Sequence, residues 1–219
     1  VPSHLKPCPQ CAPEWSAADA RAVPLRALSG PQLAALHVTS LDDDGFRHFL
    51  PRVLEVVLLV PSPTFDLGLS RSKGRAAGWK ATEAAAVREL AAIVWREVLG
   101  SYPASVGYVS DSPSLLQFVD WWDLPLPRLL GDWLRMPGLS PVRHLADLAC
   151  HVWTTRDPFE PEARAAVLSW LRDDAVGDRL QSTFFATDSD QAAAQLSAAY
   201  ELWTTCHRPG DAGGPTRPR

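Results

Sequence analysis

The sequence predicts an all-α fold, either a single helical bundle or a short stack of helical pairs. In successive segments, apolar residues recur at the i, i+3, i+4 and i+7 spacing of one helix face. Capping residues and Ser-Pro pairs begin these segments, and prolines or glycines separate them. No segment shows a sustained alternation of apolar and polar residues, which is typical of a half-buried strand. A chain of 219 residues, 46% of them hydrophobic, can bury such a core.

Composition along the chain suggests three regions. Residues 1–24 contain five prolines, which fix the backbone and remove amide donors, so we expect an extended N-terminal arm. Residues 25–207 carry the helical patterns, and we expect them to form a single helical domain of about eight helices. Residues 208–219 are rich in proline and glycine and lack large apolar side chains, which predicts a disordered tail.

The first helices have clear start signals. Ser29, followed by Gly-Pro, predicts a short helix that ends at about Val38. The acidic run Asp42–Asp44 caps the next helix, whose apolar spacing is sustained for longer than a strand over Val53–Val60 would explain. Pro51 lies within this pattern, so the helix either opens at the proline or kinks there.

The middle of the chain alternates helical patterns with breaks. Thr82–Gly100 has the clearest pattern, with a glycine at its C-terminal end, and residues 101–111 are expected to be a loop. The Ser-Pro pairs at Ser112 and Ser140 each predict a helix start, and Pro125–Pro127 interrupts the helix between them.

The last third continues in the same way. A helix is expected around Val167 and another around Leu180. Asp188–Asp190 is expected to cap a final helix that carries Tyr200 on its apolar face.

Charge and hydropathy exclude several classes of protein. A net charge of -4 is unlike that of a general nucleic-acid binder, which usually has a basic face. The local exception is the basic run 70–80, with Arg71, Lys73, Arg75 and Lys80, which is either a solvated loop or a phosphate contact. The chain contains neither the ~20 consecutive apolar residues of a membrane span nor an apolar signal segment within residues 1–24. We therefore expect a cytoplasmic protein with no membrane partner.

One face of the second predicted helix is polar and carries Arg47, His48, Arg52 and Glu55. Side chains at i,i+3 and i,i+4 form ion pairs that merely stabilise an exposed helix face. The alternative is that these residues form a patch near the start of the helix that binds an anion or another protein. Trp121 adds to this alternative because it adjoins the core residue Trp122 but points about 100° away from it, so it either covers a neighbouring helix or anchors a partner.

The cysteines raise the question of a metal. Cys8 and Cys11 form a CxxC pair, and two thiols at this spacing can bind one tetrahedral zinc ion. The remaining ligands would come from one of two Cys-His pairs, Cys150-His151 or Cys206-His207, and Cys206 with His207 is the easier reach for the arm. The alternatives are a redox-sensing thiol pair, an incidental surface pair, or, for Cys150, a small core residue.

The sequence contains no catalytic motif: there is no Gly-x-Ser-x-Gly, no HExxH, no P-loop and no Gly-x-Gly-x-x-Gly. We therefore predict no catalytic residues and no bound cofactor other than zinc. The leading hypothesis is a non-enzymatic adaptor that binds another protein, and the alternative is a zinc-binding or redox-sensing protein that uses the CxxC pair.

Three segments carry a resemblance to a group of bacterial proteins: CPQC near the start, FRHFLPRVLEVV after the acidic run, and LSAAYELW late in the chain. The chain resembles helical proteins that share a paired-cysteine arm and a segment close to FRHFLPRLLEL. Residues 46–54 are its most specific part, and residues 61–80 depart from it. The resemblance implies an all-helical fold and supplies no activity.

Overall fold

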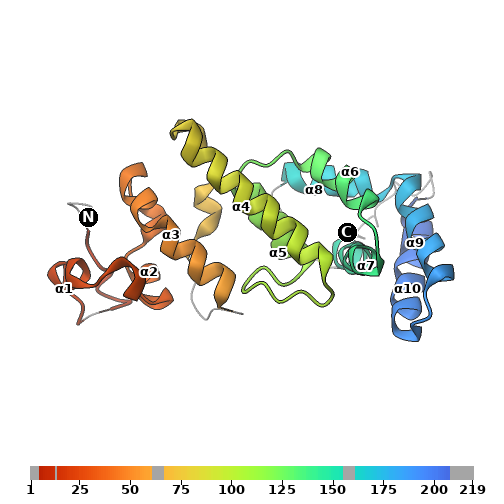
Figure 1. Ribbon diagram of the computed structural model, residues 1–219, viewed down its shortest axis with the longest axis horizontal. Helices are drawn as coiled ribbons and strands as arrows, with labels where there is room; N and C mark the ends of the chain where they lie inside the picture. Colours follow the sequence, from red (N-terminus) through yellow and green to blue (C-terminus); the bar gives the residue numbers. More distant parts are fainter. Residues whose placement is uncertain (1–4, 13, 61–66, 155–160, 208–219) are drawn as a thin grey trace, which may run out of the picture. The chain divides into compact units, whose positions relative to one another are not determined.

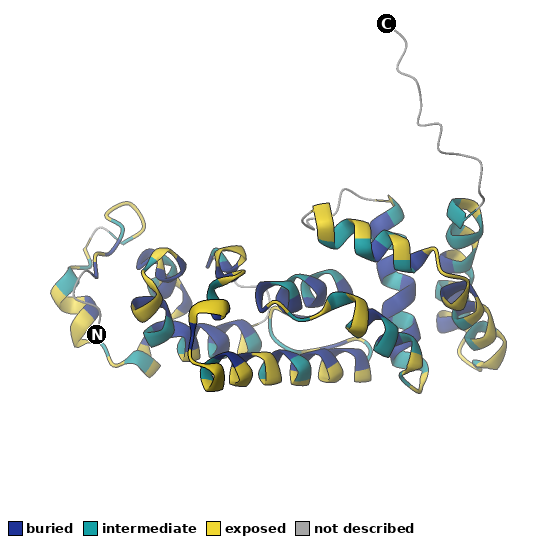
Figure 2. Ribbon diagram, turned by 90° about the horizontal axis from the view of Figure 1, so that it is seen from above, coloured by how far each residue is buried: buried dark blue, intermediate teal, exposed yellow. Residues whose placement is uncertain are grey.

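The structure is a computed structural model that describes residues 5–12, 14–60, 67–154 and 161–207. Over these residues it contains ten α-helices, four short 3-10 helices and no strand, so the all-α prediction is confirmed, although the helix count exceeds the eight expected. Most helices carry buried positions on one side and exposed positions on the other (Figure 2). Within the described ranges, no helix combines the length and the apolar character needed to cross a membrane.

Residue contacts group the chain into two compact units. Unit 1 comprises Val1–Val98 and Pro103–Leu124, and unit 2 comprises Leu99–Tyr102 and Pro125–Arg219. This division into units does not test the prediction that residues 25–207 form a single helical domain, which stays a prediction. The tail expected at residues 208–219 lies outside the described residues.

Unit 1 is built from the helices that appear from red to green in Figure 1. These are α1 (Ala17–Ala22), η1 (Leu25–Ala27), α2 (Gly30–Ala35), η2 (Val38–Ser40), α3 (Asp43–Leu59), η3 (Leu69–Ser72), η4 (Arg75–Gly78), most of α4 (Ala81–Gly100) and α5 (Ser112–Trp121).

The N-terminal arm is not wholly extended, contrary to the prediction for residues 1–24. Helix α1 forms within it because Ser16 and Asp19 make a reciprocal capping box, which the proline count had obscured. The arm is also anchored: Leu5 is 2% exposed, and the Cys8 amide donates to the Ala35 carbonyl at 2.8 Å. The start of the arm is therefore bound to the end of α2.

Helix α3 runs without interruption through Pro51, so the alternative in which the helix opens at the proline is wrong. Its true start is the predicted acidic cap, where the Asp42 carboxylate accepts from the Gly45 amide at 2.8 Å. Phe46 and Val53, both fully buried, lie on the predicted apolar face. Burial of this face outweighs the hydrogen bond that the proline cannot make.

The predicted loop at 101–111 contains a tight turn that packs on α3. Its Val106 and Val109 form an isolated antiparallel bridge, and Val109 is fully buried. The Tyr108 amide donates to the Val57 carbonyl at 2.8 Å. Gly107 at the tip has φ +54°, and its Cα lies so close to α3 that a Cβ there would be 2.4 Å from the Val57 oxygen. The close approach requires a glycine.

Unit 2 contains the remaining five α-helices. These are α6 (Leu126–Arg135), α7 (Leu139–Thr154), α8 (Pro161–Leu171), α9 (Asp174–Ala186) and α10 (Asp190–His207). Helix α10 packs against α7 and α9, and α9 and α10 are seen side by side in blue in Figure 1. The two helices approach closely because Gly177 of α9 has no side chain where the ring of Trp203 lies.

A polar network joins the four-residue segment 99–102 to α7 and α10 within unit 2. The Tyr102 hydroxyl donates to Asp147 at 2.5 Å and accepts from the Gln195 amide at 2.9 Å. Arg143 donates to the Gln195 oxygen at 2.7 Å, and its guanidinium lies 4.0 Å from the centre of the Tyr102 ring. Nearly every polar group in the network is hydrogen-bonded to another member of it, which is typical of a structural cluster rather than a catalytic one.

Candidate metal centre

The CxxC pair lies in a turn that brings both cysteines to one end of the arm. The Ala12 amide donates to the Cys8 carbonyl at 3.0 Å, which closes one turn of chain around Pro9 and Gln10. Cys8 is partly exposed and Cys11 is exposed. The hydrogen bond from the Cys8 amide to Ala35 holds this turn against the end of α2.

His37 reaches the same place from the segment between α2 and η2. Its backbone has φ 47° and ψ 47°, the left-handed conformation that residues other than glycine rarely adopt, although histidine is among the residues that tolerate it best. The surrounding backbone imposes this conformation, because the His37 amide donates to Ala34 and its carbonyl accepts from Ser40. Backbone strain of this kind is concentrated at functional sites.

Cys8, Cys11 and His37 form one cluster, in which all candidate ligand atoms lie within 4.8 Å of one another. In a tetrahedral zinc site with Zn–S near 2.3 Å and Zn–N near 2.0 Å, neighbouring ligand atoms are roughly 3.5–3.8 Å apart. Side-chain rotations that bring these atoms closer by about 1 Å would therefore form three corners of such a site. A fourth corner would remain open.

The two thiols of the cluster differ in acidity. The pKa of Cys8 is lowered to about 6, first by a hydrogen bond with the His37 side chain and then by hydrogen bonds from Cys11 and from the backbone of the turn. The pKa of Cys11 is raised, chiefly because its thiol donates to Cys8. Cys8 is therefore a thiolate near neutral pH, which is the form that binds a metal.

The structure brings His37 to the CxxC pair, and the sequence analysis missed this residue. No cysteine and no other histidine lies within ten residues of it in the sequence, and three short helices, α1, η1 and α2, separate it from Cys11. The one related signal was the helix start at Ser29, because the helix that begins there ends at Ala35, which accepts from the Cys8 amide. The contact between His37 and the CxxC turn depends on the tertiary fold, which the spacing of residues in the sequence does not predict.

The predicted ligands Cys206 and His207 lie at the end of α10 in unit 2. There, His207 lies 3.2 Å from Asp174, and its ring stacks on Trp203 with 4.4 Å between ring centres. Their pairing with the CxxC pair stays a prediction.

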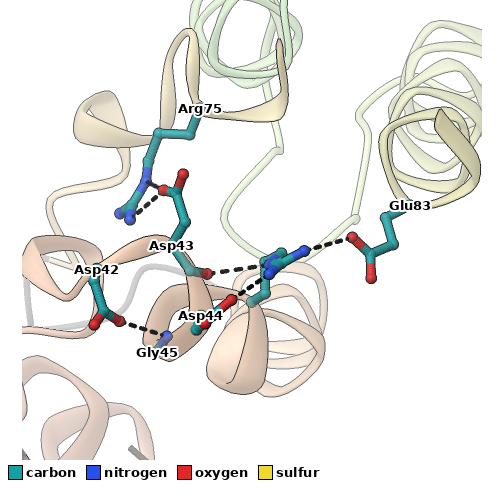
Figure 3. Close-up of polar contacts among 7 residues, drawn as sticks. Asp42, Asp43, Asp44, Gly45, Arg75 and Glu83 are labelled. Atoms are coloured by element: carbon teal, nitrogen blue, oxygen red, sulfur yellow. Dashed lines mark hydrogen bonds and ion pairs between the residues drawn. The ribbon is translucent and has the colours of Figure 1, made fainter. Parts of the chain in front are cut away.

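The side chains of the predicted partner-binding face make contacts within the chain. Arg47 forms ion pairs with Asp44 and with Glu83, the latter at 2.9 Å, so it links α3 to α4; Figure 3 labels both acidic partners. Arg52 donates to the Leu28 carbonyl at 2.8 Å and to Glu55 at 2.9 Å. These contacts explain why the arginines occur on this face.

His48 and Trp121 also have internal surroundings. The His48 ring packs edge-on against Phe49, and partial burial lowers its pKa. Trp121 is only 9% exposed and packs edge-on against Phe118. Binding of another protein by this set of residues stays a prediction, without a distinctive geometry of its own.

The basic run at 70–80 is largely paired with acidic and carbonyl groups of unit 1. Lys73 donates to Asp120 at 2.9 Å. Arg75 donates to Asp43, as Figure 3 shows, and to the carbonyls of Thr39 and Leu41. These interactions favour a structural role over contact with phosphates.

Comparisons with protein-family models, with curated proteins and with solved structures find no match for this chain. The resemblance based on CPQC and FRHFLPRVLEVV therefore stays a prediction, and functional arguments depend on the chemistry of the residues.

Proposed function

We propose that this chain is a zinc-binding helical protein in which Cys8, Cys11 and His37 are the protein ligands of the ion. The observation that carries the proposal is the convergence of two thiols and one imidazole, from two separate segments, within 4.8 Å. Thiolate and imidazole are the ligands that zinc prefers in proteins.

The ion would link the arm to the segment between α2 and η2. At present one backbone hydrogen bond, from Cys8 to Ala35, joins the CxxC turn to α2. Coordination adds bonds from Cys8 and Cys11 on one side and from His37 on the other. The free energy of zinc binding would also offset the cost of the left-handed backbone at His37, because that conformation places the imidazole at the thiols.

The proposal is tested by metal analysis of the full chain purified without chelator. We expect one zinc ion per chain, and after exchange with cobalt we expect the absorption bands of tetrahedral thiolate coordination. Cys8→Ser and His37→Asn should each weaken zinc binding by roughly 100-fold, because each removes one ligand. Asparagine is chosen because it tolerates the left-handed backbone, so the change removes the imidazole with little additional strain.

Cys206→Ser and Cys150→Ser are matched controls, since both remove a thiol from outside the cluster. Both should retain the zinc ion. A bare polypeptide in the presence of zinc and reductant would overturn the proposal. Loss of zinc in Cys206→Ser with retention in His37→Asn would instead support the ligand set predicted from the sequence.

A further inference from the structure

The proposed metal centre has an asymmetric set of ligands. Two of its three ligands, Cys8 and Cys11, are also a pair of thiols on one turn, with sulfur atoms within 4.8 Å of each other. The third ligand, His37, belongs to a different segment. A reaction that joins the two sulfurs would therefore remove two of the three ligands in one step.

The pair is accessible to a small oxidant. Cys11 is exposed and Cys8 partly exposed. The two thiols of a CxxC pair can join in a disulfide, and here the turn holds their sulfur atoms within 4.8 Å of each other. By contrast, Cys150 of α7 is half-buried and its pKa is raised by burial, so it is the less reactive thiol.

We propose that oxidation by peroxide converts Cys8 and Cys11 to a disulfide, expels the zinc ion and separates the CxxC turn from His37. This inference rests on the proposed function. It adds a mode of regulation to the same site: zinc occupancy would report the oxidation state of the two thiols.

The reaction balances with hydrogen peroxide as the oxidant. The Cys8 thiolate attacks one peroxide oxygen, the O–O bond breaks, and the products are a sulfenic acid on Cys8 and a hydroxide that takes up a proton to become water. The sulfur of Cys11 then attacks the sulfenic sulfur of Cys8, an S–S bond forms, and the hydroxide that leaves takes up the proton of the Cys11 thiol to become a second water. Two electrons pass from the sulfurs to the peroxide. The zinc ion, left with the single imidazole of His37, dissociates.

The experiment uses the full chain loaded with zinc, with a coloured chelator present and hydrogen peroxide added. We expect release of one zinc ion per chain, coupled to the loss of two hydrogen atoms from the peptide that contains Cys8 and Cys11. A dithiol reductant with added zinc should restore the original occupancy. The double variant Cys150→Ser/Cys206→Ser is the matched control and should respond as the unmodified chain does.

The outcomes separate this inference from the proposed function. If the chain takes up no zinc before peroxide is added, the proposed function fails, and the inference fails with it. If zinc loads fully but stays bound after oxidation, the inference alone fails. It also fails if zinc is released while Cys8 and Cys11 are found as separate sulfinic acids without a disulfide.

Discussion

Gly107 offers the sharpest test of the packing in unit 1. The substitution Gly107→Ala adds a Cβ that would lie 2.4 Å from the Val57 oxygen and 2.4 Å from the carbonyl carbon of Leu58. Both are backbone atoms of α3, so no side-chain rotation relieves the contact. The turn would have to move away from α3, which breaks the hydrogen bond from Tyr108 to Val57.

The expected cost of this substitution has two parts. A left-handed conformation at φ +54° costs an L-residue about 1–2 kcal/mol, and overpacking against a fixed neighbour costs about 1–3 kcal/mol. We expect Gly107→Ala to lower the free energy of unfolding by about 2–5 kcal/mol. Gly74→Ala is the matched control: Gly74 also has a positive φ, of +79°, but no atom lies within 4 Å of its Cβ position. It should cost only the backbone strain.

The assay is denaturant unfolding of the two variants, followed by tryptophan fluorescence and by circular dichroism. Subtracting the two changes cancels most of the backbone strain and leaves the contact with α3, about 1–3 kcal/mol. Hydrogen exchange at the Tyr108 amide should accelerate in Gly107→Ala alone. Equal stability of the two variants would show that the turn does not pack on α3 as described.

Three further predictions concern other contacts. Arg75→Ala should destabilise the chain by about 2–3 kcal/mol, because it leaves two backbone carbonyls and a carboxylate without their donor. The control is Arg96→Ala, which removes a hydrogen bond only to a carbonyl of its own helix. In a parallel unfolding experiment it should change stability by less than about 0.5 kcal/mol. Pro51→Ala restores an amide donor inside α3 and should raise the free energy of unfolding by about 1–3 kcal/mol, and a lower stability would contradict the account of that helix. Burial, and then the hydrogen bond to Asp147, raise the pKa of Tyr102 above its ordinary value near 10. The contribution of the neutral Tyr102 to stability is therefore complete below about pH 10 and is lost as the pH rises through the folded-state pKa. Tyr102→Phe should flatten the alkaline decline in melting temperature, and an unchanged decline would assign it to another group.

Local signals predicted much of the fold. The cap at Asp42, the Ser-Pro start at Ser112 and the break before α6 all lie within about two residues of the observed elements, because each depends on backbone hydrogen bonds between near neighbours. The short helix α1 was missed because its capping box involves only Ser16 and Asp19, among many prolines. Helices η3 and η4 were missed because a single helical turn has too few residues to show a helical spacing of apolar side chains.

The candidate metal centre was only half predictable. The spacing of Cys8 and Cys11 is a local pattern, and it was recognised. The proposed third ligand, His37, depends on how the arm returns to the end of α2, where Leu5 is buried and the Cys8 amide donates to the Ala35 carbonyl. For the polar face of α3, the sequence predicted the near ion pair of Arg52 with Glu55, but the pair of Arg47 with Glu83, 36 residues downstream, again depends on the tertiary fold; the binding of a partner by this face stays a prediction.

The interleaved sequence of the two units has a consequence during synthesis. All residues of unit 1 have been added once the ribosome passes Leu124, whereas Tyr102 of unit 2 waits for Gln195, which is 93 residues downstream. From Leu124 to Gln195 the ribosome adds 71 residues (195 − 124), which takes roughly 4–14 seconds at about 5–20 residues per second. During this time α6, α7, α8 and α9 of unit 2 are synthesised, but α10, which carries Gln195, is not yet complete. Throughout this interval the sequence of unit 1 is complete while Tyr102 still lacks Gln195, and only the synthesis of α10 completes the network around the tyrosine.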